Sequence, residues 1–426
     1  MTPEPKPPTD AGDRPGIYAW IVVGLLFVTA ALNYLDRLMI TSMRDPIRAQ
    51  IPMSDAQFGL LTSAFLAVYA IVSPLGGYLA DRVGRRRVIV SSLAIWSAAT
   101  ACTAFAHTFH QLLSARALMG VSEACYVPAA LAMVSDYHRG RTRSLATGIH
   151  MVGIYLGAAL GGIGGVFADH FGWQSGFKVF GTIGILYGVV LLMTLRDAPA
   201  IVVETTIDRP KLSAAMDALF RRAGFYVLLF INILTGVVNW AIYGWMPTFL
   251  KQQFHMTNGA AGLSGTAYIQ VASFVGVLLA GVLADRWSRR IAGARALVPG
   301  IGYIAASPFL FLAASTGTLP IAIAGLVVFG LARGAVDANQ MPLLRELVPE
   351  IYSATGYGFL NFVSTGAGGL MVYASGALLD ARIPLSLTFK ACGGALLLAG
   401  AAFVSLKFIS ATRPVGDGIG MESSGR

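Results

Sequence analysis

The sequence predicts an all-α membrane protein whose twelve transmembrane helices form two pseudo-symmetric six-helix bundles. Of its 426 residues, 55% are hydrophobic and only 12% are charged, whereas ordinary soluble domains carry about 25% charged residues. The apolar residues gather in long uncharged runs, most of them longer than the roughly 18 residues that a bilayer crossing needs. These observations exclude the water-soluble enzyme classes.

The apolar runs recur along the whole chain. The first run is too long for the core of a signal peptide, so we interpret it as the first membrane helix and expect no cleavage. We expect twelve spans, at residues 17–40, 56–80, 87–106, 111–135, 143–168, 174–195, 224–250, 259–284, 294–314, 319–342, 353–378 and 386–409.

The loops between these spans are asymmetric in charge. With both termini on one side, 22 Lys and Arg residues lie on that side and 4 on the other. Positively charged loops stay in the cytoplasm, so this asymmetry predicts an even number of spans with both termini cytoplasmic. We expect the membrane to be a bacterial inner membrane. The net charge of +10 is thus an orientation signal, and we expect no nucleic-acid partner.

The longest polar stretch between spans divides the chain into two halves. It contains two prolines and five basic residues, a composition typical of a linker. We therefore expect a disordered N-terminal tail at 1–16, a six-helix bundle at 17–195, a cytoplasmic linker at 196–222, a second six-helix bundle at 223–410 and a cytoplasmic tail at 411–426.

One loop sequence occurs in both halves. GYLADRVGRRR at 77–87 follows the second span, and GVLADRWSRR at 281–290 follows the eighth. Both copies fall on the same side of the membrane, so the halves are parallel repeats, which are expected to rock about a site between them. The loop resembles the signature loop of the major facilitator superfamily, and the resemblance covers essentially the whole chain.

We expect this loop to act as a gate that latches the cytoplasmic side in the outward-open state. Its glycines allow close approach of helices, and its carboxylates can meet an arginine or a helix N-terminus of the other bundle. The gating residues are Gly77, Asp81, Arg82, Gly84, Arg85, Asp285 and Arg286, with Gly281 as the second glycine.

Four acidic or basic residues fall inside the first and fourth predicted spans. Such residues cost about 2.5–3.5 kcal/mol each at the bilayer centre, so they usually face a cavity and a partner. Asp36 and Arg37 lie in the outer third of the first span, and Arg116 lies at a similar depth in the fourth. Glu123 is seven residues further along the same helix face, about 10 Å deeper.

We hypothesise that the two arginines hold an anionic group and that the two carboxylates take up protons. Burial favours the neutral form of Glu123 and a nearby arginine favours the charged form, so substrate and proton can compete through the same residues. The alternative is a static ion network that only fixes helix packing.

The second half places an opposite charge at the equivalent position. Aligning Gly120 with Gly330 sets Arg333 opposite Glu123, and Asp337 follows one turn later. Arg333 therefore either pairs with Asp337 or contacts substrate. The candidate cavity groups of this half are Asn232, Asn239, Trp240, Tyr243 and Asn361.

Other polar residues of the spans have simpler interpretations. His150 suits proton transfer, but a lone buried histidine is more often a packing residue. Lys178 and Lys390 lie near the outer surface, where they anchor helices. The cysteines show no metal-ligand or disulfide spacing, so we expect no metal ion and no cofactor.

The fifth span carries a run of glycines, Gly148-x8-Gly157-x3-Gly161-Gly162-x2-Gly165. This run is similar to a pattern found in exchangers of the superfamily, although Gly162 stands in place of a proline and Val166 in place of the last glycine. Close packing through small residues explains it equally well, so the direction of transport stays open.

Three further stretches resemble the bacterial spinster-like transporters: NYLDR at 33–37, SEACYVPA at 122–129 and SLATGIHMVGIYLG at 144–157. That family is linked to sphingosine phosphate and lysophospholipids. The resemblance implies binding and proton coupling for the four buried charges of the first half. Ser122 stands where many members have glycine, and NYLDR also looks like the element of organic-anion and sugar-acid proton symporters.

The predicted function is therefore proton-coupled transport of an amphipathic anionic lipid, with a compact organic or sugar acid as the alternative. Tyr155 and Trp240 would add aromatic walls. The predicted site residues are Asp36, Arg37, Arg116, Glu123, Tyr34, Tyr126, Arg333, Asp337, Asn239 and Tyr243.

The expected partners are the solute, protons and the lipid bilayer, and we expect a monomer. A passive channel, a lipid scramblase and a non-transporting sensor are alternatives outside this class. No nucleophile with a base, metal cluster or phosphate-binding loop appears in a suitable context, so we expect no enzyme activity.

Overall fold

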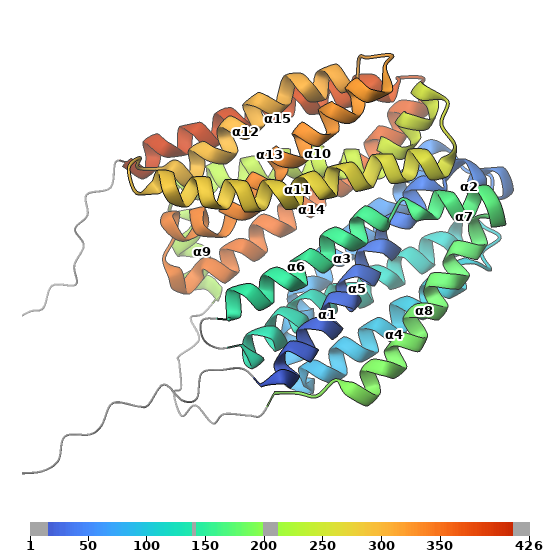
Figure 1. The fold of residues 1–426 in the computed structure, drawn as a ribbon, viewed down its shortest axis with the longest axis horizontal. Coiled ribbons are helices and arrows are strands. Elements are labelled where there is room, and N and C mark those ends of the chain that lie inside the picture. Colours follow the sequence, from blue (N-terminus) through green and yellow to red (C-terminus); the bar gives the residue numbers. More distant parts are fainter. Residues whose placement is uncertain (1–15, 139–141, 199–211, 412–426) are drawn as a thin grey trace, which may run out of the picture.

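The computed structural model of the chain describes residues 16–138, 142–198 and 212–411, and the regular elements of these ranges are all helical (Figure 1). The predicted tails lie outside the described residues, apart from Gly16 and Ala411. The middle of the predicted linker lies outside them as well.

The first half of the chain forms one bundle. Its short helices come from the loop after the first span and from a break in the fifth. The helices are α1 (Ile17–Met39), η2 (Ile40–Ser42), α2 (Arg44–Gln50), α3 (Asp55–Val83), α4 (Arg85–Thr103), α5 (Phe109–Tyr137), α6 (Arg143–Leu160), α7 (Ile163–Phe171) and α8 (Trp173–Thr194).

The second half forms a second bundle beside the first, shown in yellow to red in Figure 1. Its helices are α9 (Leu212–Phe220), α10 (Ala223–Phe254), α11 (Asn258–Ser288), α12 (Ala294–Ala313), α13 (Leu319–Leu347), η3 (Glu350–Tyr352), α14 (Ser353–Asp380) and α15 (Leu385–Ala411).

Eleven of the predicted spans correspond to helices that are long and apolar enough to cross a membrane. The remaining predicted span, the third at 87–106, forms α4, which is long enough to cross a membrane but less hydrophobic than the others. Three arginines begin this helix, and its buried side chains include Ser92, Ser97 and Thr100. The expected fold class is thus confirmed as an all-helical membrane protein, while α4 is more polar than a typical span.

The last part of the predicted linker forms a helix, which the sequence did not predict. In α9, Ala215 and Leu219 are buried four residues apart, which is the spacing of one face of an amphipathic helix. Phe220 packs against Phe225 and Phe359. The segment therefore belongs to the second bundle, and the short length of the helix hid its periodicity among the charges around it.

The glycine run of the fifth span serves helix packing. A Cβ on Gly157 would lie 2.1 Å from the Ala31 carbonyl oxygen, and a Cβ on Gly162 would lie 2.2 Å from Gly262 of the other bundle. Only glycine allows backbones to approach so closely. The packing interpretation is confirmed at these positions, whereas Gly148 has no neighbour within 4 Å of such an atom.

The two bundles meet mainly at the end that carries α2 and α7 (Figure 1). The opposite end, where α1 begins and α15 ends, is called the terminal side. At the end that carries α2 and α7, the first part of α3 packs against the last part of α14, with Gly376 against Asp55 and Gly59 against Val372. Helices α6 and α7 also pack against the start of α11. The described hydrogen bonds between the two bundles are found at this end and near the centre of the molecule. The bundles are therefore in contact at this end and apart on the terminal side.

Candidate functional site

A buried ion pair occupies the centre of the first bundle. The Nη2 atom of Arg37 on α1 lies 2.9 Å from Oε2 of Glu123 on α5, and its Nε donates to the same oxygen at 3.2 Å. The two side chains are only 2% and 0% exposed. Such burial strengthens the attraction and also makes either charge costly without the other.

The neighbouring polar groups hold this pair in place. Asn33 lies one turn before Arg37 on α1 and accepts a hydrogen bond from its Nη2 at 3.3 Å. Arg116, two turns before Glu123 on α5, donates to the Arg37 carbonyl oxygen at 3.1 Å. Asp36 instead faces α4, where it accepts a bond from Thr100 at 3.4 Å. The four predicted charges thus lie together, with Asp36 on the side away from the ion pair.

Aromatic rings surround the Arg37 guanidinium. Its Cζ atom lies 4.5 Å from the ring centre of Tyr34, 4.7 Å from that of Tyr69 and 4.9 Å from that of Phe65. Such cation–π contacts stabilise a cation where water is excluded. Arg37 therefore has an environment suited to an anion that carries an apolar or aromatic face.

Tyr126 lies apart from the aromatic rings around Arg37, although its sequence position predicts a site residue. Its hydroxyl donates to the Leu26 carbonyl oxygen at 2.8 Å. Its ring packs edge-on against Trp96 at 5.5 Å and lies 5.9 Å from the ring of His150. It therefore belongs to the interior of the first bundle rather than to a wall between the bundles.

The second bundle holds its own polar cluster around Arg333 on α13. Its Nη2 atom lies 3.4 Å from Oδ2 of Asp337, one turn along the same helix. Its Nη1 donates to Gln270 at 3.1 Å and to Ser273 at 3.2 Å, both on α11. The predicted pair between Arg333 and Asp337 is present, and α11 adds two polar partners.

One hydrogen bond joins this cluster to the first bundle. The Tyr155 hydroxyl on α6 donates to Asp337 Oδ2 at 2.7 Å, and the Tyr155 ring lies 5.7 Å from the Arg333 guanidinium carbon. Tyr243 on α10 lies on another side of Arg333, at 5.3 Å, and accepts a bond from Gln270 at 2.8 Å. Tyr34 packs in one small cluster with Tyr243 and Trp240, so aromatic rings of both bundles meet between the two charged groups.

The remaining candidates of the second half divide into two groups. Asn232 donates to the Leu228 carbonyl and accepts from Gln340, so it serves helix packing. Asn239 is partly buried, and its Oδ1 atom has no hydrogen-bond partner among the described residues. Asn361 is partly exposed. Asn239 Oδ1 is thus a buried acceptor without a described donor.

The two lysines near the outer surface each lie over an aromatic ring. The Nζ atom of Lys178 lies 5.3 Å from the Phe105 ring, and that of Lys390 lies 5.6 Å from the Phe311 ring. These contacts use lysine as an anchor rather than as a ligand for substrate.

The first loop motif forms contacts within its own bundle. Arg85 pairs with Asp136 on α5, donates to the Ala132 carbonyl at 2.8 Å and lies 3.9 Å from Asp81. Gly84 has a φ of +100°, which L side chains rarely adopt, so glycine permits the sharp turn between α3 and α4. Arg82 lies over the Tyr78 ring at 4.9 Å.

The second copy of the motif is also held within its bundle. Asp285 lies 3.4 Å from Arg295, which lies 3.4 Å from Glu346. Arg286 lies at the end of α11 and is exposed. The copies make no described hydrogen bond or ion pair with the opposite bundle in this conformation.

The close approach expected at Gly77 and Gly281 is absent here. A Cβ on Gly77 would meet only Pro128 at an ordinary 3.7 Å, and one on Gly281 would meet nothing within 4 Å. Gly76 makes the tight contact instead, with a Cβ position 2.6 Å from the Cys125 Cα. The physical reason is the separation of the bundles on the terminal side, which leaves both motif glycines without a described helix of the other bundle against them.

The opposite side is closed by carboxylates that cap helices of the other bundle. Asp380 at the end of α14 accepts from the backbone N–H groups of Asp55 and Ala56 at 2.8 Å each. Asp169 on α7 accepts from the Gly259 N–H and from the Asn258 side chain at 2.7 Å each. Both carboxylates lie at helix N-termini, where unpaired N–H groups favour negative charge.

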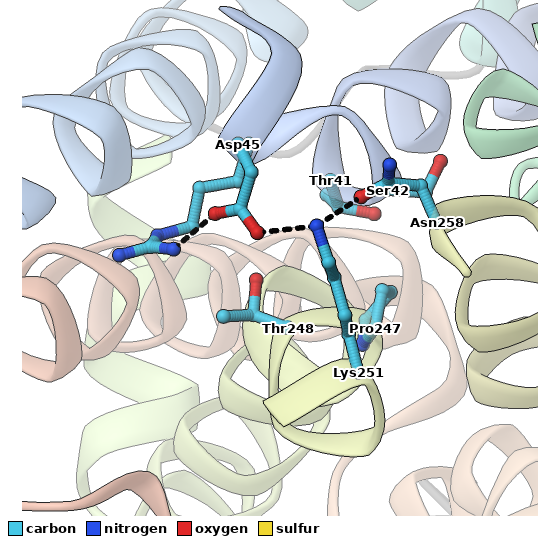
Figure 2. Close-up of a pocket in the computed structure, with 8 residues that line it drawn as sticks. Thr41, Ser42, Asp45, Pro247, Thr248, Lys251 and Asn258 are labelled. Atoms are coloured by element: carbon cyan, nitrogen blue, oxygen red, sulfur yellow. Dashed lines mark hydrogen bonds and ion pairs between the residues drawn. The ribbon is translucent and has the colours of Figure 1, made fainter. Parts of the chain in front are cut away.

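A small pocket lies beside these caps, between η2, α2 and α10. Figure 2 shows Lys251 reaching across it to Asp45 and Asn258, with Nζ–O distances of 2.5 and 2.9 Å. Partial burial opposes ionisation of Asp45, but Lys251 and Arg44 outweigh it, so the pKa of Asp45 is held below its usual range. This ion pair is a third contact that closes the bundles at this end.

Sequence reasoning missed several residues of the site. Tyr69, Gln270 and Ser273 are uncharged, and such residues are common in membrane helices. Gln270 had one signal, because an amide inside a predicted span needs a polar partner. The described residues contain no group of His, Cys, Asp and Glu that could hold a metal ion.

Two parallel helical bundles around buried charges define the class of a membrane transport protein. Residues 26–372 match the Major Facilitator Superfamily. This match covers most of the chain, so the protein belongs to that superfamily.

Its relatives include transporters of different solutes. The hexuronate transporter of Bacillus subtilis is 25% identical over 92% of this chain and 94% of its own length. The probable sulfoacetate transporter SauU of Cupriavidus necator is 26% identical over 89% and 92%. Human protein spinster homolog 1 is 28% identical over 71% of this chain and 61% of its own length, so the chain spans about three-fifths of that relative.

A solved structure shares the fold. It is described as a bacterial homolog to the human lysosomal transporter Spinster in an inward-facing and unoccupied conformation. The TM-score is 0.75 at 22% identity, over 93% of this chain and 95% of that chain. The expected resemblance to both the superfamily and spinster proteins is therefore confirmed.

Proposed function

We propose that this protein is a proton-coupled secondary active transporter of an anionic solute, which works by alternating access in a bacterial inner membrane. Its twelve spans would include α4, which packs beside α5 and α8 as a full member of the first bundle. The excess of positive charge in the loops on the side of the termini supports a cytoplasmic location for that side.

The buried pair of Arg37 and Glu123 carries this proposal. When the anionic group of a solute takes the Arg37 guanidinium, Glu123 loses its partner in a site with almost no exposure. An unpaired carboxylate is costly there, so proton uptake by Glu123 accompanies solute binding. Release of the solute restores the ion pair and expels the proton.

The contacts between the bundles support a rocking mechanism. The closed end, held by Asp380, Asp169 and Lys251, would be the outer side, and the present conformation would open to the cytoplasm. Opening outward breaks these contacts and brings the loops at 77–87 and 281–290 together as the cytoplasmic latch.

Two classes of solute are supported by different observations. An amphipathic anionic lipid fits the aromatic rings around Arg37 and the spinster relatives. A compact organic acid fits the amide and hydroxyl groups beside Arg333 and the hexuronate and sulfoacetate relatives, which match nearly full length.

The test is uptake by proteoliposomes under an imposed pH gradient. The radiolabelled solutes would be glucuronate, sulfoacetate, lysophosphatidate and sphingosine phosphate. We expect accumulation of one class that collapses when a protonophore removes the gradient. Equal flux with and without the gradient would contradict the proposal and favour a passive channel or scramblase.

A further inference from the structure

A column of buried polar groups runs through the interior of the first bundle, away from the interface between the bundles. It begins at Asp36 and Glu123 and extends past α4 and α5 to His150 on α6. Six buried atoms in or beside it make no hydrogen bond of good geometry with the described residues: Asp36 Oδ1, Glu123 Oε1, Trp96 Nε1, Ser97 Oγ, and His150 Nδ1 and Nε2.

Such a concentration of unsatisfied atoms needs an explanation. Each buried polar atom left without a partner costs about 1–3 kcal/mol, and buried water usually supplies the missing bonds. The polarity of α4 has the same explanation. Ser92, Trp96 and Thr100 recur at four-residue spacing and are all buried, so one face of this helix lines the column.

The groups of the column follow one another in space. Thr100 contacts Asp36, and Trp96 lies one turn before Thr100 on α4. Trp96 packs against Tyr126, whose ring lies 5.9 Å from that of His150. Tyr126 itself lies one turn beyond Glu123, and its hydroxyl is bound to the Leu26 carbonyl.

His150 lies at the end of the column nearest to the terminal side. It is fully buried and seven residues from the start of α6, about 10 Å along the helix axis. The described groups recorded beside it are uncharged: α5 presents the Tyr126 ring and α1 presents the Leu26 carbonyl. Tyr187 and Thr29 lie next to Tyr126 and are uncharged as well. A buried imidazole whose described neighbours are uncharged can accept a proton on one ring nitrogen and release one from the other.

We propose that buried water molecules join Asp36 and Glu123 to His150, and that this line conducts the transported proton between the central site and the cytoplasm. The proton would thus travel inside the first bundle, while the solute passes between the bundles. This inference rests on the proposed proton coupling, and it assigns the coupling path to residues outside the solute site.

The transport test compares two substitutions of His150 with the wild type. His150→Gln keeps hydrogen bonding, and His150→Leu removes it. The probe is whichever of glucuronate, sulfoacetate, lysophosphatidate or sphingosine phosphate the wild type accumulates. In both variants we expect proton-driven accumulation to fall by more than about tenfold, while counterflow, which needs no net proton movement, stays near the wild-type rate.

A matched control is available in the same bundle. His138 is also buried, but its ring nitrogens lie 3.1 Å from Thr142 Oγ1 and 3.2 Å from the Ala19 carbonyl. His138→Gln should leave the ratio of accumulation to counterflow unchanged. Normal accumulation in either His150 variant, or rescue by Gln but not Leu, would overturn the inference while the proposed function stands. Failure of proton-driven uptake in the wild type would overturn both.

A second measurement needs no substrate and also covers variants that fail to fold. Solid-state NMR of the wild-type protein in liposomes, labelled with ¹⁵N-histidine, would detect contact between water and each imidazole. We expect a water cross peak for His150, assigned in ¹³C,¹⁵N-labelled wild-type protein by correlation of its ring with its own backbone and with the neighbouring Ile149 and Met151. A His150 signal without water contact would refute the proposed line.

Discussion

The two halves of the molecule treat a buried arginine in different ways. In the first bundle, Arg37 and Glu123 are 2% and 0% exposed and lie on different helices. In the second, Arg333 and Asp337 are 15% and 34% exposed, lie on one helix and are joined to the other bundle by Tyr155. The first pair is therefore suited to respond to protonation, and the second to respond to the position of the opposite bundle.

This comparison predicts that the energetic effect of breaking an ion pair follows its burial. The outer pair of Asp45 and Lys251, with exposures of 38% and 29%, extends the series. Isolated charges are costly where water is excluded and cheap where water can replace the partner.

The largest effect is expected at the first pair. Arg37→Ala leaves Glu123 buried without its partner and should lower the free energy of unfolding by about 3–5 kcal/mol, measured in mixed micelles. Transport should be lost as well.

A double substitution separates stability from function at this pair. Arg37→Met combined with Glu123→Leu removes both charges and fills similar volume, so stability should recover while transport stays absent. Recovery of proton-driven transport in this double variant would show that the pair only fixes helix packing.

A smaller effect is expected at the second pair. Arg333→Ala leaves Gln270 and Ser273 without their donor, but Asp337 can gain water. The loss of stability should be about 1–3 kcal/mol, reduced by solvent screening. Arg333→Lys serves as the control, because it keeps the charge but cannot make all three contacts. If Arg333→Ala lost as much stability as Arg37→Ala, the comparison between the two pairs would be wrong.

The bond between Tyr155 and Asp337 should affect conformation more than stability. Tyr155→Phe removes the 2.7 Å hydrogen bond and keeps the ring over Arg333. We expect the separation of the bundles to shift toward the outward-open state, measured as spin-label distances across each end. Asp380→Asn should shift the same distances by weakening the cap on α3, and unchanged distances in both variants would contradict this account of closure.

The smallest effect is expected at the outer pair. The pKa of Asp45 is lowered in the folded state, so its contribution is present above its ordinary pKa of about 3.9 and is lost as the pH falls through the lowered value. Asp45→Asn should cost about 0.2–1 kcal/mol at pH 7. The difference in melting temperature from the wild type should shrink below pH 4; a difference that grows with acidity would have the wrong sign.

Most of the fold could be predicted from the sequence because apolar length and loop charge are local properties. The same holds for Arg37 and Glu123, since a charge inside an apolar run is conspicuous. Helix α9 was missed because nine amphipathic residues between charged segments give little periodic signal. The roles of Gln270 and Tyr155 could not be predicted, because each depends on a contact with another helix. Gln270 on α11 contacts Arg333 on α13, and Tyr155 on α6 contacts Asp337 of the second bundle.

The position of Tyr126 teaches a similar point. It lies three residues from Glu123, so helix periodicity alone allowed it a place near the site. Its contacts with Trp96 and the Leu26 carbonyl instead turn it into the bundle. A helix position gives depth and an approximate face, but the neighbouring helices decide what the side chain meets.

The central claim is that Glu123 exchanges its ion pair for a proton during transport. The most direct test follows a pH-sensitive dye trapped in proteoliposomes while the transported solute is added without any imposed gradient. We expect solute-driven proton movement by the wild type and none by Glu123→Gln, although that variant should still exchange solute in counterflow. Solute-driven proton movement of normal size in Glu123→Gln would contradict this claim.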